Sequence, residues 1–187
     1  ESYPDLALLA DACTHWPFLQ LRLRALESDF AEVTGFCMSD ALASLRAGRV
    51  DMALQCCCAA TAQFAAATIW LEMGVRPARL VGTGNGLLVA ACVTRVLSYR
   101  DMLRCLQAQA RKIPLQTLWH ELDLQTPRLS LFRQGTAVRF GTEIQQPQFW
   151  NDALAKSDET CLAHGDGEVH AFNVWPNHNE GGNASWL

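Results

Sequence analysis

Residues 75–92 read VRPARLVGTGNGLLVAAC, and this stretch decides which fold the chain can adopt. A short β-type run at 79–81 leads into a glycine-dense turn, and an apolar helix follows at once and continues to about residue 96. Upstream, residues 51–73 are apolar nearly all round and end at Gly74, which is typical of a buried helix packed against a sheet and closed by a glycine C-cap. Helix, strand, tight turn and helix in this order predict an α/β layered fold.

The chain on both sides of this stretch predicts further helices and strands, with no internal repeat and no low-complexity linker. Ser98 is the expected N-cap of an amphipathic helix that runs to about residue 112. Short helices joined by polar turns are expected over 6–45, with Pro17 and Gly35 as breaks. The other predicted elements are helices at 115–122 and 147–156, strands at 127–132 and 169–174, a turn at Gln134-Gly135 and a loose tail from residue 177.

Length and composition are those of one globular domain. The chain has 187 residues, of which 50% are hydrophobic and 18% charged, and its net charge is −4. Lys and Arg are scattered rather than clustered, so no nucleic acid is expected as a partner. No signal segment is found and no apolar run approaches the roughly 20 residues that span a bilayer, so no membrane is expected either. The eight cysteines lack pairing spacing, which indicates reduced, buried thiols and a cytoplasmic location.

The glycine-dense turn has three interpretations. It consists of Gly82, Thr83, Gly84, Asn85 and Gly86. A nucleophile elbow, G-x-S-x-G, has this frame between a strand and a helix, but its middle position is Gly84, which has no side chain to act as a nucleophile. A dinucleotide fingerprint, G-x-G-x-x-G, requires a third glycine where Leu87 stands, and the acidic residue nearest the required distance, Asp101, lies in a helical pattern. The third interpretation is a tight turn that only allows the strand and the helix to pack.

Other reactive side chains form weaker candidate sites. Cys92 lies on the helix after the turn, where a small core residue is the simpler interpretation. The run 56–58 lies in the preceding helix with no adjacent basic group that would favour a thiolate. His15 and His120 stand alone in the sequence. A late group with loose spacing and intervening glycines is more typical of a solvated loop than of a metal site, and it comprises Cys161, His164, Asp166, Glu168 and His170. The residues therefore predict no catalytic side chain, no metal site and no cofactor.

Several segments around the turn occur together, in this order, in one known family. Residues 55–70, 73–77 and 81–82 resemble the glutamine-containing helix, the Trp-x-x-x-Gly-Val-x-Pro segment and the strand that precede a Gly-His-Ser-x-Gly-Glu elbow. Further likeness lies at 90–93, 96–103, 127–132, 146–150 and 171–176. The chain thus resembles the malonyl- and acyltransferase domains of polyketide and fatty acid synthases, over roughly residues 50–176 with one large gap.

The departures from the family pattern carry the functional prediction. The family serine corresponds to Gly84, the preceding histidine to Thr83 and the elbow glutamate to Leu87. Gln109 stands where the resemblance places an arginine that pairs with the malonyl carboxylate, and an amide cannot neutralise that charge. The family's small ferredoxin-like subdomain, near whose end the catalytic histidine lies, has no counterpart here. His178 is near a position where the family has a histidine.

The resemblance implies a three-layer α/β/α fold with a small, mostly parallel sheet, similar to the large subdomain of these acyltransferases and to an α/β-hydrolase core. We expect residues 1–187 to form a single degenerate domain and, because the first residue is not Met, to be part of a larger multidomain synthase. The expected function is that of a non-catalytic pseudo-acyltransferase, which spaces or docks neighbouring ketosynthase and acyl carrier protein domains or a partner subunit. Two alternatives stay open: an active acyltransferase or hydrolase completed by residues outside the chain, and a nucleotide-binding module at the glycine turn.

Overall fold

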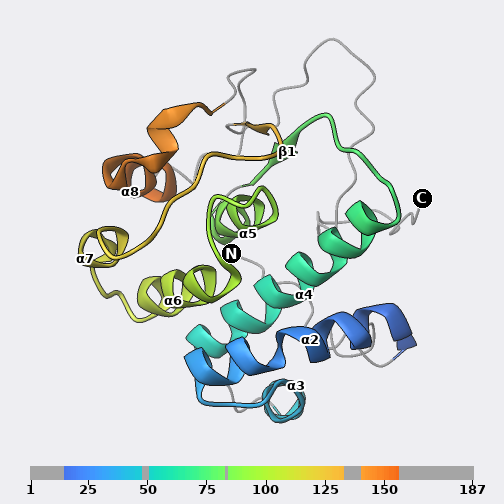
Figure 1. Cartoon of the computed structure of the whole chain (residues 1–187). Helices are drawn as coiled ribbons and strands as arrows, with labels where there is room; N and C mark the ends of the chain where they lie inside the picture. The colour runs from blue at the N-terminus through green and yellow to red at the C-terminus, as the bar shows by residue number, and fades with distance from the viewer. Residues whose placement is uncertain (1–14, 48–50, 83, 133–139, 156–187) are drawn as a thin grey trace, which may run out of the picture.

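A computed structural model describes residues 15–47, 51–82, 84–132 and 140–155 of the chain. These residues are mostly helical, and their two short strands pair with each other (Figure 1). The elements are α2 (Pro17–Thr34), α3 (Met38–Arg46), α4 (Met52–Glu72), β1 (Leu80–Val81), α5 (Asn85–Val93), α6 (Tyr99–Ala110), α7 (Leu115–Trp119), β2 (Leu131–Phe132), the 3-10 helix η1 (Thr142–Gln145) and α8 (Pro147–Ala155).

Helix α4 forms the centre of the described structure. It starts as predicted, because the Asp51 carboxylate accepts a hydrogen bond from the Leu54 backbone N–H at 2.7 Å, and Gly74 follows its end with a φ of 95°. Figure 1 shows α4 passing between α2 and α3 on one side and α5 and α6 on the other, and it contacts all four. Among the described residues α4 packs against helices, so its predicted packing against a sheet is not confirmed. A helix that is apolar all round needs partners on every side, and neighbouring helices provide them.

Helix α4 is also long and apolar enough, by length and composition alone, to cross a bilayer. This corrects the expectation that no apolar run approaches that length. In the structure, 67% of its most apolar window is buried inside the protein. Burial of this kind is characteristic of the core helix of a globular domain, which passes the same compositional test.

The strands β1 and β2 form a parallel pair, with Leu80 opposite Leu131. Both are shorter than the sequence predicts. The backbone N–H groups of Gln125 and Arg128 donate instead to the carbonyls of Val96 and Thr94, so the segment before β2 joins the turn after α5 rather than a longer ladder. The parallel direction agrees with the predicted sheet. The strand expected at 169–174 and the turn at Gln134-Gly135 lie outside the described residues.

The turn between α5 and α6 is tighter than expected. Helix α5 ends at Val93 rather than near residue 96, and the Val96 N–H donates to the Ala91 carbonyl at 2.8 Å across a residue in the left-handed conformation, Arg95, with a φ of 68°. Ser98 then caps α6 as predicted, accepting from the Asp101 backbone N–H at 3.1 Å. This short connection holds α6 against α5.

Two helices at the far end of the chain are joined by aromatic side chains. Helix α8 occupies the predicted range, whereas α7 has only five residues of the predicted eight because the chain turns after Trp119. The rings of Trp119 and Trp150 stack with centroids 5.4 Å apart, and both are buried. Each indole N–H has an acceptor, the Asn151 side-chain oxygen at 3.1 Å and the Ile144 carbonyl at 2.7 Å.

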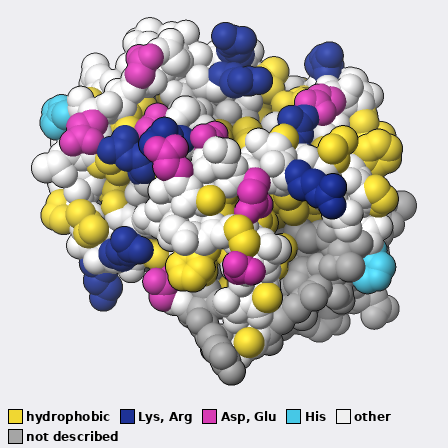
Figure 2. Space-filling view, turned by 60° about the horizontal axis from the view of Figure 1, so that its bottom comes forward, with side chains coloured by type: hydrophobic (Ala, Val, Ile, Leu, Met, Phe, Trp, Pro, Cys, Tyr) yellow, Lys and Arg dark blue, Asp and Glu magenta, His cyan; other side chains and the backbone are white. Residues whose placement is uncertain are grey.

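The N-terminal helices cover one side of α4. Pro17 starts α2 and Gly35, with a φ of 78°, ends it, as the sequence predicts, although α2 is longer than the short helices expected there. Figure 2, which brings the side of α2 and α3 forward, shows acidic, basic and apolar side chains intermixed over this face. Phe18 and Leu21 of α2 are exposed, at 67% and 69%.

The left-handed residue that follows α6 allows a test of how this helix ends. Lys112 has a φ of 57°, and the Ile113 N–H donates to the Ala108 carbonyl at 2.8 Å across it. A left-handed conformation costs a residue with a Cβ about 1–2 kcal/mol, and glycine avoids this strain. We expect Lys112→Gly to raise the free energy of unfolding by up to about 1 kcal/mol in urea titrations. Lys112→Ala, which keeps the Cβ, should leave stability unchanged, and an equal gain in both variants would contradict this account.

Candidate functional site

The candidate site is the sharp turn between β1 and α5. Gly84 immediately precedes α5 and has a φ of 50° and a ψ of −127°. A positive φ of this kind is strained for any residue with a Cβ, and a strained strand-to-helix turn is what a nucleophile elbow requires. The predicted strand, turn and helix are therefore confirmed, with Gly84 at the bend. Thr83 lies outside the described residues.

Gly82 explains why the turn needs a glycine before the bend. A Cβ built on Gly82 would lie 2.4 Å from the Gly86 carbonyl oxygen and 2.6 Å from the Leu87 Cα, which are backbone atoms that cannot move aside alone. The strand end and the first turn of α5 therefore approach too closely for any side chain at this position. A Cβ on Gly86 would meet nothing within 4 Å, so Gly86 is not required on this ground.

Asn85 directs its side chain toward α4. Its amide nitrogen donates to the Cys56 sulfur at 3.4 Å, and Cys56 is buried. Sequence reasoning placed Asn85 in the elbow but did not predict this contact, because the pairing joins residues 29 apart in the chain. The contact ties the start of α5 to the central helix.

The chemistry available at the bend is limited by what Gly84 lacks. Acyl transfer through a covalent intermediate needs a nucleophile, a base to activate it and donors for the developing oxyanion. Gly84 projects only a hydrogen where the resemblance places the serine. Leu87, at the position of the elbow glutamate, is buried with 4% of its surface exposed and belongs to the apolar core.

The buried cysteines are poor substitutes for that nucleophile. Burial raises the pKa of Cys92 and of Cys105 to about 12, and burial together with the neighbouring Cys58 and Cys56 raises the pKa of Cys57. The Cys57 thiol donates to the Leu103 carbonyl at 3.9 Å inside the core. These thiols stay protonated at neutral pH, and the thiolate is the reactive form.

Gln109, where the resemblance places a carboxylate-binding arginine, lies in the last turn of α6. Its side chain is half-buried, and its amide oxygen is buried without a hydrogen-bond partner among the described residues. A neutral amide in this environment cannot supply the charge that a guanidinium offers to a carboxylate. Gln109 therefore does not provide the charge that a carboxylate-binding site needs.

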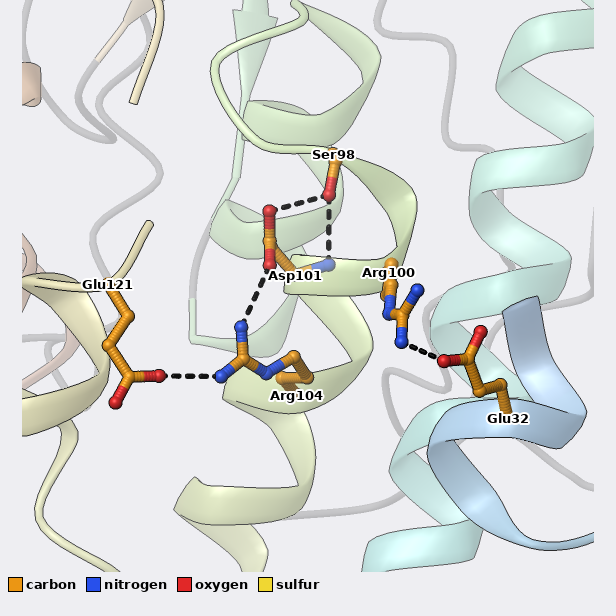
Figure 3. Close-up of polar contacts among 6 residues, drawn as sticks. All are labelled: Glu32, Ser98, Arg100, Asp101, Arg104 and Glu121. Atoms are coloured by element: carbon orange, nitrogen blue, oxygen red, sulfur yellow. Dashed lines mark hydrogen bonds and ion pairs between the residues drawn. The ribbon is translucent and has the colours of Figure 1, made fainter. Parts of the chain in front are cut away.

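The most connected polar side chains lie away from the turn. Figure 3 shows Arg104 of α6 between Asp101, at 3.3 Å, and Glu121, at 2.8 Å, while Arg100 pairs with Glu32 of α2. These pairs are largely exposed, where ion pairs add little to stability. The Arg100 and Arg104 pairs join α6 to α2 and to the turn after α7. Of the polar contacts in Figure 3, the sequence predicted only the Ser98 cap.

The remaining sequence candidates do not form a site. His15 and His120 are both exposed. Among the residues that the structure describes, no group of three or more His, Cys, Asp or Glu side chains could hold a metal ion. The late group at 161–170 and His178 lie outside those residues.

Comparisons with known proteins place these features in context. No family model matches the chain. Short segments match curated proteins: the chain is 39% identical over 49 residues to "3-methylorcinaldehyde synthase" of Sarocladium schorii and 40% identical over 57 residues to "Non-reducing polyketide synthase dpmpA" of Macrophomina phaseolina. These matches cover 26% and 30% of this chain, and the chain spans only 2% of the length of each relative.

A solved structure shares the fold. The acyl transferase domain of ZmaA superposes with a TM-score of 0.68 and 11% sequence identity, covering 82% of this chain and 55% of that chain. At this identity the likeness concerns the fold alone. Together with the matched segments, it confirms that the chain resembles an acyltransferase-like domain of a polyketide synthase.

The close approach at Gly82 gives a prediction with an internal control. Gly82→Ala should lower the free energy of unfolding by about 2 kcal/mol or more, because its Cβ must displace backbone of α5. Gly86→Ala, inside α5 with open space around its Cβ, should instead stabilise the protein by up to about 1 kcal/mol. Chemical denaturation measures both changes. If Gly82→Ala unfolds at the same denaturant concentration as the parent protein, the close approach does not exist.

The burial of the thiols predicts their reactivity. With iodoacetamide at pH 8, Cys92 and Cys105 should be alkylated at least about tenfold more slowly than the half-buried Cys37, as followed by peptide mass spectrometry. In urea the three rates should converge. A Cys92 that reacts in the native protein as fast as Cys37 would contradict the packing described above and would make this thiol a candidate nucleophile.

Proposed function

We propose that this chain is a non-catalytic, acyltransferase-like domain of a polyketide synthase with a structural, spacer or docking role. The observation that carries the proposal is Gly84: the bend of a nucleophile elbow is present, and the residue at the bend has no side chain. Glycine adopts this positive φ without strain, so the support for an elbow origin lies in the position of Gly84 between β1 and α5, where a nucleophile elbow has its serine.

Three further observations support the absence of acyl transfer. The elbow glutamate position is a core leucine, Leu87, and the carboxylate-binding position carries the neutral Gln109. The cysteines closest to the turn in the fold are buried, and Cys92 has a pKa of about 12. Removing one member of a catalytic triad typically lowers the rate by several powers of ten, and restoring such a site would need several residues at once.

The rest of the proposal extends beyond the described residues. We propose that the complete domain is a three-layer α/β/α structure whose small parallel sheet includes β1 and β2. Its neighbours would be ketosynthase and acyl carrier protein domains or a partner subunit, in a cytoplasmic multidomain synthase. The curated relatives support this context, since one of them is named as a non-reducing polyketide synthase.

Acyl loading tests the proposal directly. The purified chain is incubated with malonyl- and acetyl-coenzyme A, and its intact mass is measured beside that of a malonyltransferase of known activity. We expect no acyl adduct on this chain and an adduct on the control, because no side chain is available at the bend to form an ester.

Gly84→Ser distinguishes a missing nucleophile from a missing site. If only the serine were lost, this variant would become acylated. Since Gln109 and Leu87 stand at the positions of the carboxylate-binding arginine and the elbow glutamate, we expect it to stay unmodified. An adduct on the unmodified chain, mapped by peptide mass spectrometry, would reject the proposal and favour an active acyltransferase or hydrolase with an unusual nucleophile.

A further inference from the structure

Aromatic side chains on the last two described α-helices contact one another. The Trp119 ring of α7 stacks on the Trp150 ring of α8. The Phe149 ring meets the Trp150 ring edge-on with centroids 5.3 Å apart, and the Phe140 ring meets the Phe149 ring in the same way at 4.7 Å. Pairs with these geometries add to the free energy gained from burial alone. The rings therefore form one continuous apolar cluster that holds α7 to α8.

Hydrogen bonds and buried side chains tie η1 and β2 to the same cluster. The Trp150 indole N–H donates to the carbonyl of Ile144 in η1, and the Ile144 side chain is buried. The Phe140 N–H donates to the Leu131 carbonyl of β2 at 2.9 Å. We name these four elements, α7, β2, η1 and α8, the aromatic lobe; its described residues are 115–132 and 140–155.

The helices α2 to α6 form a second group around α4, which we name the helical body. Figure 1 shows α7 and α8 on the side of α5 and α6 that is away from α4. Helix α8 has its main contacts with α7 and η1, and α6 contacts both α4 and α7. The lobe is thus attached to the helical body mainly through α6 and through the strand pair.

The attachments between lobe and helical body are short or exposed. Strands β1 and β2 pair over two residues each, and an isolated two-stranded pair is only marginally stable in water. The ion pair of Arg104 with Glu121 joins α6 to the turn after α7, and its side chains are 37% and 63% exposed. Two backbone hydrogen bonds, from Gln125 and Arg128, reach the turn after α5. Contacts of this kind open at a lower free energy than a buried core does.

The chain passes from the helical body to the lobe through residues 111–114, all of which are exposed. Lys112 has a φ of 57°, and Pro114 directly precedes the first residue of α7. Hinges are commonly a few residues at the ends of elements, where the backbone absorbs large changes in φ and ψ. This junction can therefore change its backbone angles without displacing a buried side chain.

We propose that the aromatic lobe opens from the helical body as one unit, with residues 111–114 as its hinge. The lobe keeps its buried rings when it opens, so the boundary separates before either part loses its own packing. Opening also unpairs β1, because the Leu80 N–H loses the Ser130 carbonyl to which it donates at 3.0 Å. Since β1 leads into the glycine turn, the lobe controls whether the strand before Gly84 is paired.

Hydrogen exchange of the full chain, followed by NMR or by peptide mass spectrometry, tests this opening. We expect the backbone amides of α8 to exchange at least about tenfold faster than those in the middle of α4, because α4 is exposed only when the whole protein unfolds. The Leu80 amide should exchange at the rate of the α8 amides, since the same opening releases both.

Arg104→Gln tests whether the lobe moves as one unit. The ion pairs of Arg104 are with Asp101 and Glu121, whereas α8 has its main contacts inside the lobe. We expect this variant to speed the exchange of the α8 amides by about two- to fivefold, the effect of losing one exposed ion pair, and to leave α4 unchanged. Arg22→Gln is the matched control, because it removes an exposed pair with Glu72 inside the helical body and should leave α8 unchanged.

Three results would overturn the opening of the lobe. These are exchange in α8 as slow as in α4, faster exchange in Arg104→Gln that is confined to α7, or equal effects of the two variants on α8. Far-UV circular dichroism checks that both variants are folded. The inference does not depend on the proposed function, and none of these measurements involves acyl transfer.

Discussion

The burial of α4 is the constraint on which the rest of this structure depends. A helix of 21 residues that is apolar on every side cannot face water, so α2, α3, α5 and α6 are arranged around it. Its small side chains let these neighbours approach closely, and its buried polar groups are satisfied locally. The Thr61 hydroxyl, for example, donates to the Cys57 carbonyl and lies 2.9 Å from the Tyr99 hydroxyl. Contacts with this central helix hold both the glycine turn and α6 in place.

The turn at Gly84 keeps the shape of a sharp strand-to-helix bend without a side chain at the bend. Its geometry follows from packing: β1 and α5 meet so closely that Gly82 can carry no side chain, and the amide of Asn85 is fixed against Cys56 of α4. These requirements persist whether or not a nucleophile stands at the bend. Glycine at the bend also avoids the strain that a residue with a Cβ would experience there.

The ion pairs on the described surface link elements that are far apart in the sequence. Arg22 of α2 pairs with Glu72 of α4, and Arg100 of α6 pairs with Glu32 of α2. Arg104 of α6 pairs with Glu121 in the turn after α7. These pairs therefore join α6 and α4 to their neighbours and neutralise charge between the helices.

Local patterns in the sequence were sufficient for most elements of this protein. Cap residues such as Asp51 and Ser98, the breaks at Pro17 and Gly35, and the strand-turn-helix frame around Gly84 act over a few residues, so they could be recognised without the fold. Only the tertiary structure decided that α4 is enclosed by helices rather than by a sheet, that β2 is cut short because Arg128 bonds to Thr94, and that Asn85 contacts Cys56 of α4. Each of these depends on contacts between residues far apart in the chain, which arise from the mutual burial of whole faces and leave no local signature.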